Sequence, residues 1–152
     1  MRLPYVYGLV ATAFAAGLIG ARLAPTAEAQ STPPLAPQII NVFDLADAEI
    51  GPMVPNTDIR SRALVVTEYG TVSLQSGNVA KHFHADAHEM QLIVAGAGSF
   101  WLGDKEQQVK AGDLIIIPKG THHAGSKATT GRFRAVAIKL PPQKQGDVHP
   151  VP

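Results

Sequence analysis

From residue 63 onward, the sequence alternates between short apolar runs and turns that contain glycine. Runs of roughly four to eight apolar residues bounded by such turns are typical of β-strands. The segment 96–98, Gly-Ala-Gly, predicts one of these turns, and no stretch of this region shows a long helical period. Many short strands at close spacing predict an all-β sandwich or barrel. The predicted strands lie in segments 63–74, 89–95, 99–102, 106–109, 114–118, 121–124 and 133–140.

Two Pro-rich segments flank this predicted barrel of residues 63–140. Residues 30–38 are polar and Pro-rich, which predicts an extended leader, and a strand at 39–43 is expected to follow it. Glycine and prolines interrupt residues 51–62, so 30–62 is interpreted as a leader and N-terminal segment outside the barrel. The C-terminal segment 141–152, PPQKQGDVHPVP, is predicted to be a disordered tail, the alternative being a segment packed loosely on the surface.

The first 29 residues have the pattern of a secretory signal peptide. Arg2 precedes an apolar run, and the Ala-Glu-Ala sequence at 27–29 offers a cleavage site, so we expect cleavage after Ala29. The competing interpretation is an uncleaved membrane anchor. Pro4 and the short, Ala/Gly-rich run favour cleavage, because a spanning helix needs about 20 predominantly apolar residues. We therefore expect a periplasmic or secreted protein with no stable membrane span after cleavage.

The composition narrows the function classes. The chain has 152 residues, 45% hydrophobic and 16% charged, which suits one globular domain. It has thirteen Lys and Arg against twelve Asp and Glu, and removing residues 1–29 leaves eleven of each. A neutral domain has no net field to attract nucleic acid, so no nucleic-acid partner is expected. The absence of cysteine excludes disulfides and thiolate chemistry.

The histidines are unevenly placed: all six follow residue 81, and five lie between His82 and His123. On a strand, the side chains of His82 and His84 leave the same face, because side-chain direction alternates with a period of two. Glu89 opens the next apolar run after a four-residue loop, where an unpaired buried carboxylate would be costly. The sequence thus predicts two imidazoles beside a carboxylate. The alternative is an exposed strand with solvated side chains.

A third imidazole comes from the segment 112–123. Pro118 ends a predicted strand, Gly120 permits a tight turn, and His122 and His123 enter the next strand. Only one of the two histidines can point inward, and these residues alone leave both open. Three imidazoles and a carboxylate suit one divalent transition metal, such as Fe, Mn, Zn, Ni or Cu. Four protein ligands would leave an octahedral ion two positions for water, oxygen or substrate.

These two segments resemble the two conserved motifs of the cupin superfamily, G-x5-H-x-H-x3,4-E-x6-G and G-x5-P-x-G-x2-H-x3-N. Two positions depart from them. Only four residues separate Gly77 from His82, and Lys127 stands where the second motif has Asn. Neither departure affects a metal ligand. The positions that fit the motifs are His82, Phe83, His84, Glu89, Gly96, Gly112, Pro118, Gly120 and His123.

The resemblance implies a double-stranded β-helix, or jelly roll, over about residues 63–140. Its spacing selects His123 over His122, so the implied metal ligands are His82, His84, Glu89 and His123. It also implies dimerisation through an outer sheet, which is usual in the family, with segment 39–43 as a candidate exchanged strand.

A fold shared by many activities does not identify a function. The resemblance favours a metal-dependent enzyme of dioxygenase, isomerase or lyase type that acts on a small organic molecule. The alternatives are a non-catalytic module that binds a metal or small ligand, and a domain whose metal only braces the barrel. An enzyme would need a general acid or base, for which Glu89, His88 and His122 are weak candidates.

Overall fold

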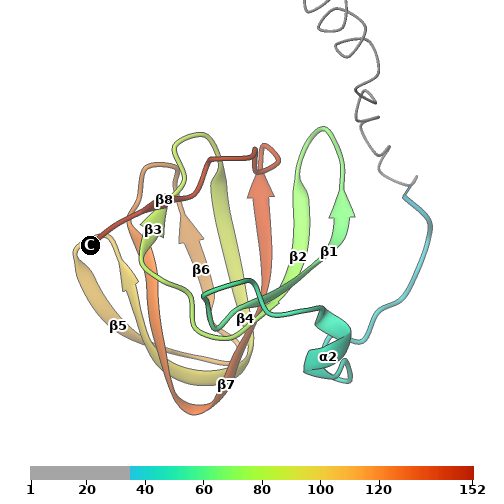
Figure 1. Ribbon diagram of the computed structural model, residues 1–152, viewed down its shortest axis with the longest axis horizontal. Coiled ribbons are helices and arrows are strands. Elements are labelled where there is room, and N and C mark those ends of the chain that lie inside the picture. Colours follow the sequence, from blue (N-terminus) through green and yellow to red (C-terminus); the bar gives the residue numbers. More distant parts are fainter. Residues whose placement is uncertain (1–34) are drawn as a thin grey trace, which may run out of the picture. The chain divides into compact units, whose positions relative to one another are not determined.

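The computed structural model describes residues 35–152, so the predicted signal peptide at 1–29 lies outside the described residues. Within them, one short helix precedes eight strands that form a curled sheet (Figure 1). None of the helices in this range is long and apolar enough to cross a membrane. The elements are α2 (Asp47–Ile50), β1 (Arg60–Val66), β2 (Thr71–Ser76), β3 (His82–Phe83), β4 (His88–Leu102), β5 (Lys105–Lys110), β6 (Leu114–Ile117), β7 (His123–Leu140) and β8 (His149–Pro150).

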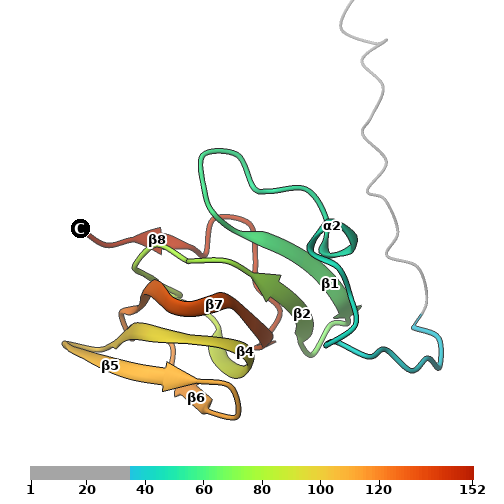
Figure 2. The same cartoon turned by 90° about the horizontal axis from the view of Figure 1, so that it is seen from below.

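Two long strands, β4 and β7, run through the centre of the sheet. They pair antiparallel from His88 opposite Leu140 to Leu102 opposite His123. The other edge of β4 pairs with β5 and β6, while β7 also pairs with β2 and β3. Figure 2 shows β1, β2, β7, β4 and β5 following one another around the curve. The all-β prediction is confirmed.

The predicted turn at 96–98 is wrong, because these residues lie inside β4. Gly96 has a φ of +81°, and the β4–β7 ladder shifts register on both sides of it. A Cβ at Gly98 would lie 2.1 Å from the carbonyl oxygen of Lys127, so only glycine lets the two backbones approach. Glycines here make bulges that bend a strand without ending it. Segments 121–124 and 133–140 are likewise joined in β7, whereas 63–74 is divided between β1 and β2.

Alternation along the strands gives the inner face of the sheet an apolar part and a polar part. Ile93, Phe100, Ile117 and Phe133 belong to the apolar core. Further along the same strands, the register places Thr71, Lys139, Glu89 and Ile117 side by side on β2, β7, β4 and β6. This row carries two buried charges, those of Glu89 and Lys139. The fold therefore concentrates its buried polarity in one place.

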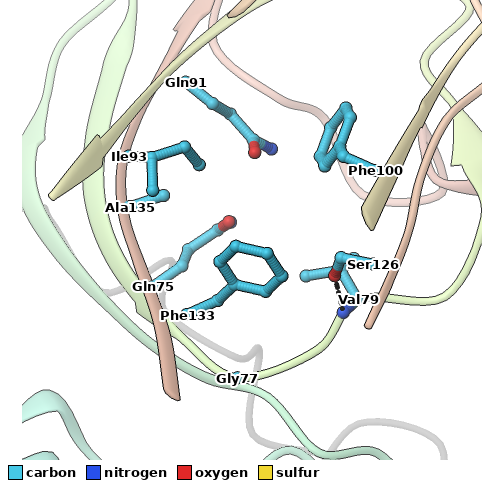
Figure 3. A pocket seen from close by; sticks show the side chains of 9 residues that line it. All are labelled: Gln75, Gly77, Val79, Gln91, Ile93, Phe100, Ser126, Phe133 and Ala135. Atoms are coloured by element: carbon cyan, nitrogen blue, oxygen red, sulfur yellow. Dashed lines mark hydrogen bonds between the residues drawn. The ribbon is translucent and has the colours of Figure 1, made fainter. Parts of the chain in front are cut away.

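A small cavity of about 20 Å³ lies between these two parts of the interior. Figure 3 shows the amides of Gln75 and Gln91 directed into it, with the rings of Phe100 and Phe133 at its sides. A volume of this size has room for about one water molecule. The polar part of the interior thus extends inward from Glu89 as far as Gln75.

The N-terminal segment packs on the outer face of the sheet. Ile50 of α2 is 1% exposed and forms a second apolar cluster with Leu74 and Val94. The guanidinium of Arg134 fixes this segment by donating hydrogen bonds to the Asp47 carboxylate and the Leu45 carbonyl oxygen, both at 2.8 Å. The predicted strand at 39–43 is absent: these residues form no ladder, and their side chains are largely exposed.

The C-terminal segment 141–152, predicted to be disordered, packs against the barrel. Strand β8 pairs with β3, with His149 opposite Phe83 and Pro150 opposite His82, and the Val151 amide donates to the Lys81 carbonyl oxygen. The composition is misleading because β3 has a free edge that can pair with another strand. Proline lacks an amide hydrogen, but its neighbours in β8 can still make the backbone hydrogen bonds of this pairing. The strand-bearing region consequently runs from Arg60 to Pro150, beyond the predicted limits of 63–140.

Candidate metal centre

The structure brings together the four ligands that the sequence predicts. His82 lies on β3 opposite His123 at the start of β7, His84 follows β3, and Glu89 lies on β4. All four side chains are buried, with exposed fractions of 8% or less. Their ligand atoms lie within 4.8 Å of one another. Residues that are 41 positions apart in the sequence, from 82 to 123, thus share one small volume.

A backbone carbonyl holds each imidazole by its Nδ1 atom. The Nδ1 atoms of His82, His84 and His123 lie 2.8, 2.8 and 2.9 Å from the carbonyl oxygens of Ala80, Asp147 and Thr121. A carbonyl oxygen can only accept, so each Nδ1 must donate its proton. Each Nε2 atom is then left with a lone pair for a metal ion, which is the usual arrangement around ligating histidines.

The Nε2 atoms meet the carboxylate of Glu89. Those of His84 and His123 both lie 3.1 Å from its Oε2 atom, and His84 Nε2 is buried without a hydrogen-bond partner. A nitrogen lone pair and a carboxylate oxygen repel each other at this distance unless a proton or a metal ion lies between them. Ligand atoms about 2.1 Å from one ion and about 90° apart would lie about 3 Å from each other. The residues therefore fit a divalent transition metal.

The other oxygen of Glu89 is held on the opposite side. Gln91 donates to Oε1 from 3.0 Å, and the ammonium nitrogen of Lys139 lies 3.4 Å from it. Burial raises the pKa of Glu89, but contacts with His123 and His84 and the charge of Lys139 outweigh that effect and hold it well below its usual range. Glu89 is therefore ionised, and its two oxygens face different partners.

Sequence reasoning missed the contribution of Asp147 from the C-terminal segment. Besides its carbonyl contact with His84, its Oδ1 atom accepts from the amides of Ala85 and Asp86 at 2.8 and 2.9 Å. Burial raises the pKa of Asp147, yet these backbone hydrogen bonds and His84 lower it below its ordinary value. Asp147 thereby fixes the loop that carries His84. No spacing in the sequence indicates this contact, which joins residues 63 positions apart.

A cavity of about 610 Å³ opens beside the four ligands. His82, His84 and Glu89 form part of its wall together with Gln91 and Lys139. The loop around 54–59, the strands β1 and β2, the segment 78–81 and residues of the C-terminal segment complete the wall. This volume suits a small organic molecule placed against the metal position.

The two other histidines considered as acid–base candidates do not reach the cavity. His88 and His122 are both exposed, and neither lines it. The Nδ1 atom of His88 accepts from the Lys119 amide at 3.3 Å, and the His122 ring lies 5.5 Å from that of Phe83. Of the three candidates, Glu89 alone lies in the site, where it is one of the four candidate metal ligands.

Acidification is expected to destabilise the metal-free protein through His82. Burial and the neighbouring His123 lower the pKa of His82 from 6.5 to about 4. Because the folded state holds the neutral form, stability is full above pH 6.5 and falls as the pH drops toward 4. The shift predicts a loss of about 2 kcal/mol between pH 7 and pH 4.5, measurable by urea unfolding.

Two variants separate this effect from general acid denaturation. His82→Asn should flatten the pH dependence between pH 6.5 and 4.5, whereas His122→Asn, which changes an exposed histidine, should keep the wild-type slope. A stability that stays constant over this interval in the wild type would contradict the assignment.

Comparisons with known proteins agree with the fold and the motif. Residues 70–139 match the family model described as Cupin domain. An uncharacterised conserved protein with a double-stranded β-helix domain from Klebsiella pneumoniae has 20% identity and a TM-score of 0.58, with 70% of this chain and 91% of that chain covered. A comparison with curated protein sequences found no match.

Two named proteins share the architecture at low identity. Streptomyces Pac13, described as a nucleoside dehydratase, has 23% identity and a TM-score of 0.53, covering 66% of this chain and 83% of that chain, and a variant of it was solved with uridine. KdgF from Halomonas sp. has 16% identity and a TM-score of 0.51, covering 58% and 82%. Taken with the curled sheet, these matches show the double-stranded β-helix fold, within which residues 70–139 match the cupin domain model.

Proposed function

We propose that this protein binds one divalent transition metal through His82, His84, Glu89 and His123 and acts as a metal-dependent enzyme on a small organic molecule. The observation that carries the proposal is the convergence of imidazole Nε2 atoms on Glu89 Oε2, with every Nδ1 atom occupied by a carbonyl. When bound, the ion would supply Lewis acidity or a position for oxygen. The protein supplies the ligands and the cavity that orients a substrate.

Elemental analysis of the purified domain tests the metal site. Near-stoichiometric Fe, Mn, Zn, Ni or Cu is expected in the wild type and none in the His82→Ala/His84→Ala double variant. His88→Ala/His122→Ala is the matched control, because it removes two exposed histidines and should keep the metal. A folded wild type that contains no metal and takes up none would reject the ligand assignment.

A cavity beside the ligands favours catalysis over a purely structural metal. A structural site has a closed shell, whereas His82, His84 and Glu89 all line a space of about 610 Å³. Pac13 with uridine is a precedent for a small ligand in this fold. Dioxygenase, isomerase and lyase activities are the classes to assay once the ion is known. The alternative is a non-catalytic module that binds a small ligand at the same metal.

Export to the periplasm or medium is the second part of the proposal. It rests on the basic start, the apolar run and the Ala-Glu-Ala sequence at 27–29. Mass spectrometry of the full-length chain after expression in a bacterium with a periplasm should show a mature protein that begins at Gln30. An intact N-terminus in the membrane fraction would instead support an anchor.

The outer face of the sheet supports a homodimer. Leu92 lies opposite Leu114 across β4 and β6, and Ile116 lies two residues further along β6; the exposed fractions of Leu92, Leu114 and Ile116 are 41%, 59% and 56%. A contiguous exposed apolar patch of this kind is typical of an interface. Analytical ultracentrifugation should find a dimer for the wild type and a monomer for Ile116→Lys, while Lys105→Glu on exposed β5 should remain dimeric. A monomeric wild type would reject this interface.

A further inference from the structure

We propose that Lys139 determines the substrate class of this site, which takes a small carboxylate whose anionic group lies between the metal ion and the Lys139 ammonium. The inference rests on the proposed metal-binding function and extends it. Lys139 is only 6% exposed, yet it lines the cavity of about 610 Å³ beside three of the metal ligands.

The position of Lys139 follows from the β-sheet register. Phe133, Ala135, Ala137 and Lys139 alternate along β7 as buried residues of the inner face. Lys139 lies opposite Glu89 of β4 on one side and opposite Thr71 of β2 on the other. Glu89 and Thr71 also line the cavity. The backbone therefore places a cation directly beside the metal position rather than at the protein surface.

Charge balance points to an anionic ligand. In the absence of an ion, Lys139 compensates Glu89, whose Oε1 atom lies 3.4 Å from the ammonium. A divalent ion would neutralise that carboxylate by itself, and Lys139 would then be a buried cation next to a cation. Such an arrangement is costly unless a further anion lies between them. A carboxylate that contacts both positive groups satisfies this requirement.

The remaining charges around the cavity do not remove this excess. Asp58 also lines the cavity, but its carboxylate accepts from the guanidinium of Arg132 at 2.8 Å. The ammonium of Lys81 lies 4.2 Å from the centroid of the Trp101 ring, where it makes a cation–π contact. Lys139 is thus the cation best placed to meet a ligand bound at the metal.

The rest of the cavity indicates the body of that ligand. Val54, Ile59, Val79 and Val148 contribute apolar side chains to its wall. An aromatic or branched aliphatic group attached to the carboxylate would bury apolar surface against them. Mandelate combines such a body with a carboxylate, and mandelamide has nearly the same shape without the negative charge. The pair therefore isolates the contribution of charge.

Binding of the two probes to cobalt-loaded protein tests the inference, with the visible spectrum of Co²⁺ as the readout. Metal content is measured first in every variant. Lys139→Gln, which keeps a polar contact to Glu89 but removes the charge, should weaken mandelate binding about 10-fold or more and change mandelamide binding less than about 2-fold. Lys139→Met serves as a second uncharged variant. Lys105→Met, which changes an exposed lysine of β5 outside the cavity, is the control and should leave both affinities unchanged.

The outcomes distinguish this inference from the metal site itself. A wild type that takes up no cobalt would reject the proposed function. If the wild type is loaded, the inference is overturned when it binds neither probe, or when Lys139→Gln leaves mandelate binding unchanged. Equal losses for both probes would also overturn it, because Lys139 would then act only by positioning Glu89.

Discussion

Replacing Glu89 by leucine is expected to destabilise the metal-free protein by about 3–5 kcal/mol. The carboxylate is 1% exposed and is the partner of Lys139, which is itself 6% exposed. Without it, the ammonium stays buried beside an apolar side chain, and Gln91 loses the acceptor of its amide. The free energy of unfolding, measured by urea denaturation of both proteins without metal, should show this loss.

A double variant tests whether the buried charge is the cause. Glu89→Leu/Lys139→Met removes both charges and should recover at least about 2 kcal/mol relative to Glu89→Leu. Met90→Leu is the matched control, because this neighbouring residue faces the other side of β4. If the double variant is no more stable than Glu89→Leu, the Lys139 ammonium is hydrated through the cavity. The two charges are then not coupled, and the prediction is contradicted. Neither Glu89 variant should retain the metal at wild-type affinity.

Deleting residues 142–152 is expected to lower metal affinity by about 100-fold. The deletion removes the carbonyl oxygen that accepts from His84 Nδ1 at 2.8 Å. It also removes Asp147 Oδ1, which binds two amides of the His84 loop, and the pairing of β8 with β3. His84 would then be free to rotate or to change its tautomer. Competition with a chelator, followed by metal analysis, measures the change.

Two point variants resolve which part of the segment matters. Asp147→Asn keeps both the main-chain carbonyl and a side-chain oxygen acceptor, so its metal affinity should stay within a few-fold of wild type. Lys144→Ala changes a lysine of the same segment that is 71% exposed, and it should have no effect. Wild-type affinity in the truncated protein would mean that the segment covers the barrel without orienting His84.

The strand pattern was readable because side-chain alternation and glycine-rich breaks are local features. The strand prediction failed at 96–98, because glycine occurs both in turns and in β-bulges. Gly96 predicts a turn, but its positive φ produces a bulge inside β4, since the neighbouring strand continues to supply hydrogen bonds. A single sequence does not contain that information, because a bulge and a turn use the same residue type.

Proline in residues 141–152 misled for a related reason. Composition reports how poorly a segment forms structure by itself, whereas β8 is ordered by the free edge of β3.

Lys139 was equally hard to recognise. Both faces of 133–140 are largely apolar, so only pairing with β2 and β4 shows that Lys139 points inward beside Glu89.

The sequence by itself predicted the class of the fold and the four candidate metal ligands, with the choice of His123 over His122 resting on the family resemblance. His82, His84 and Glu89 are close in the chain, and a period of two suffices to put the two imidazoles on one face. Tertiary structure alone decided the surroundings: the carbonyl of Asp147 behind His84, the ammonium of Lys139 beside Glu89, and the cavity in front of them. These contacts join distant segments, and their geometry depends on how the sheet curls, which no local pattern encodes.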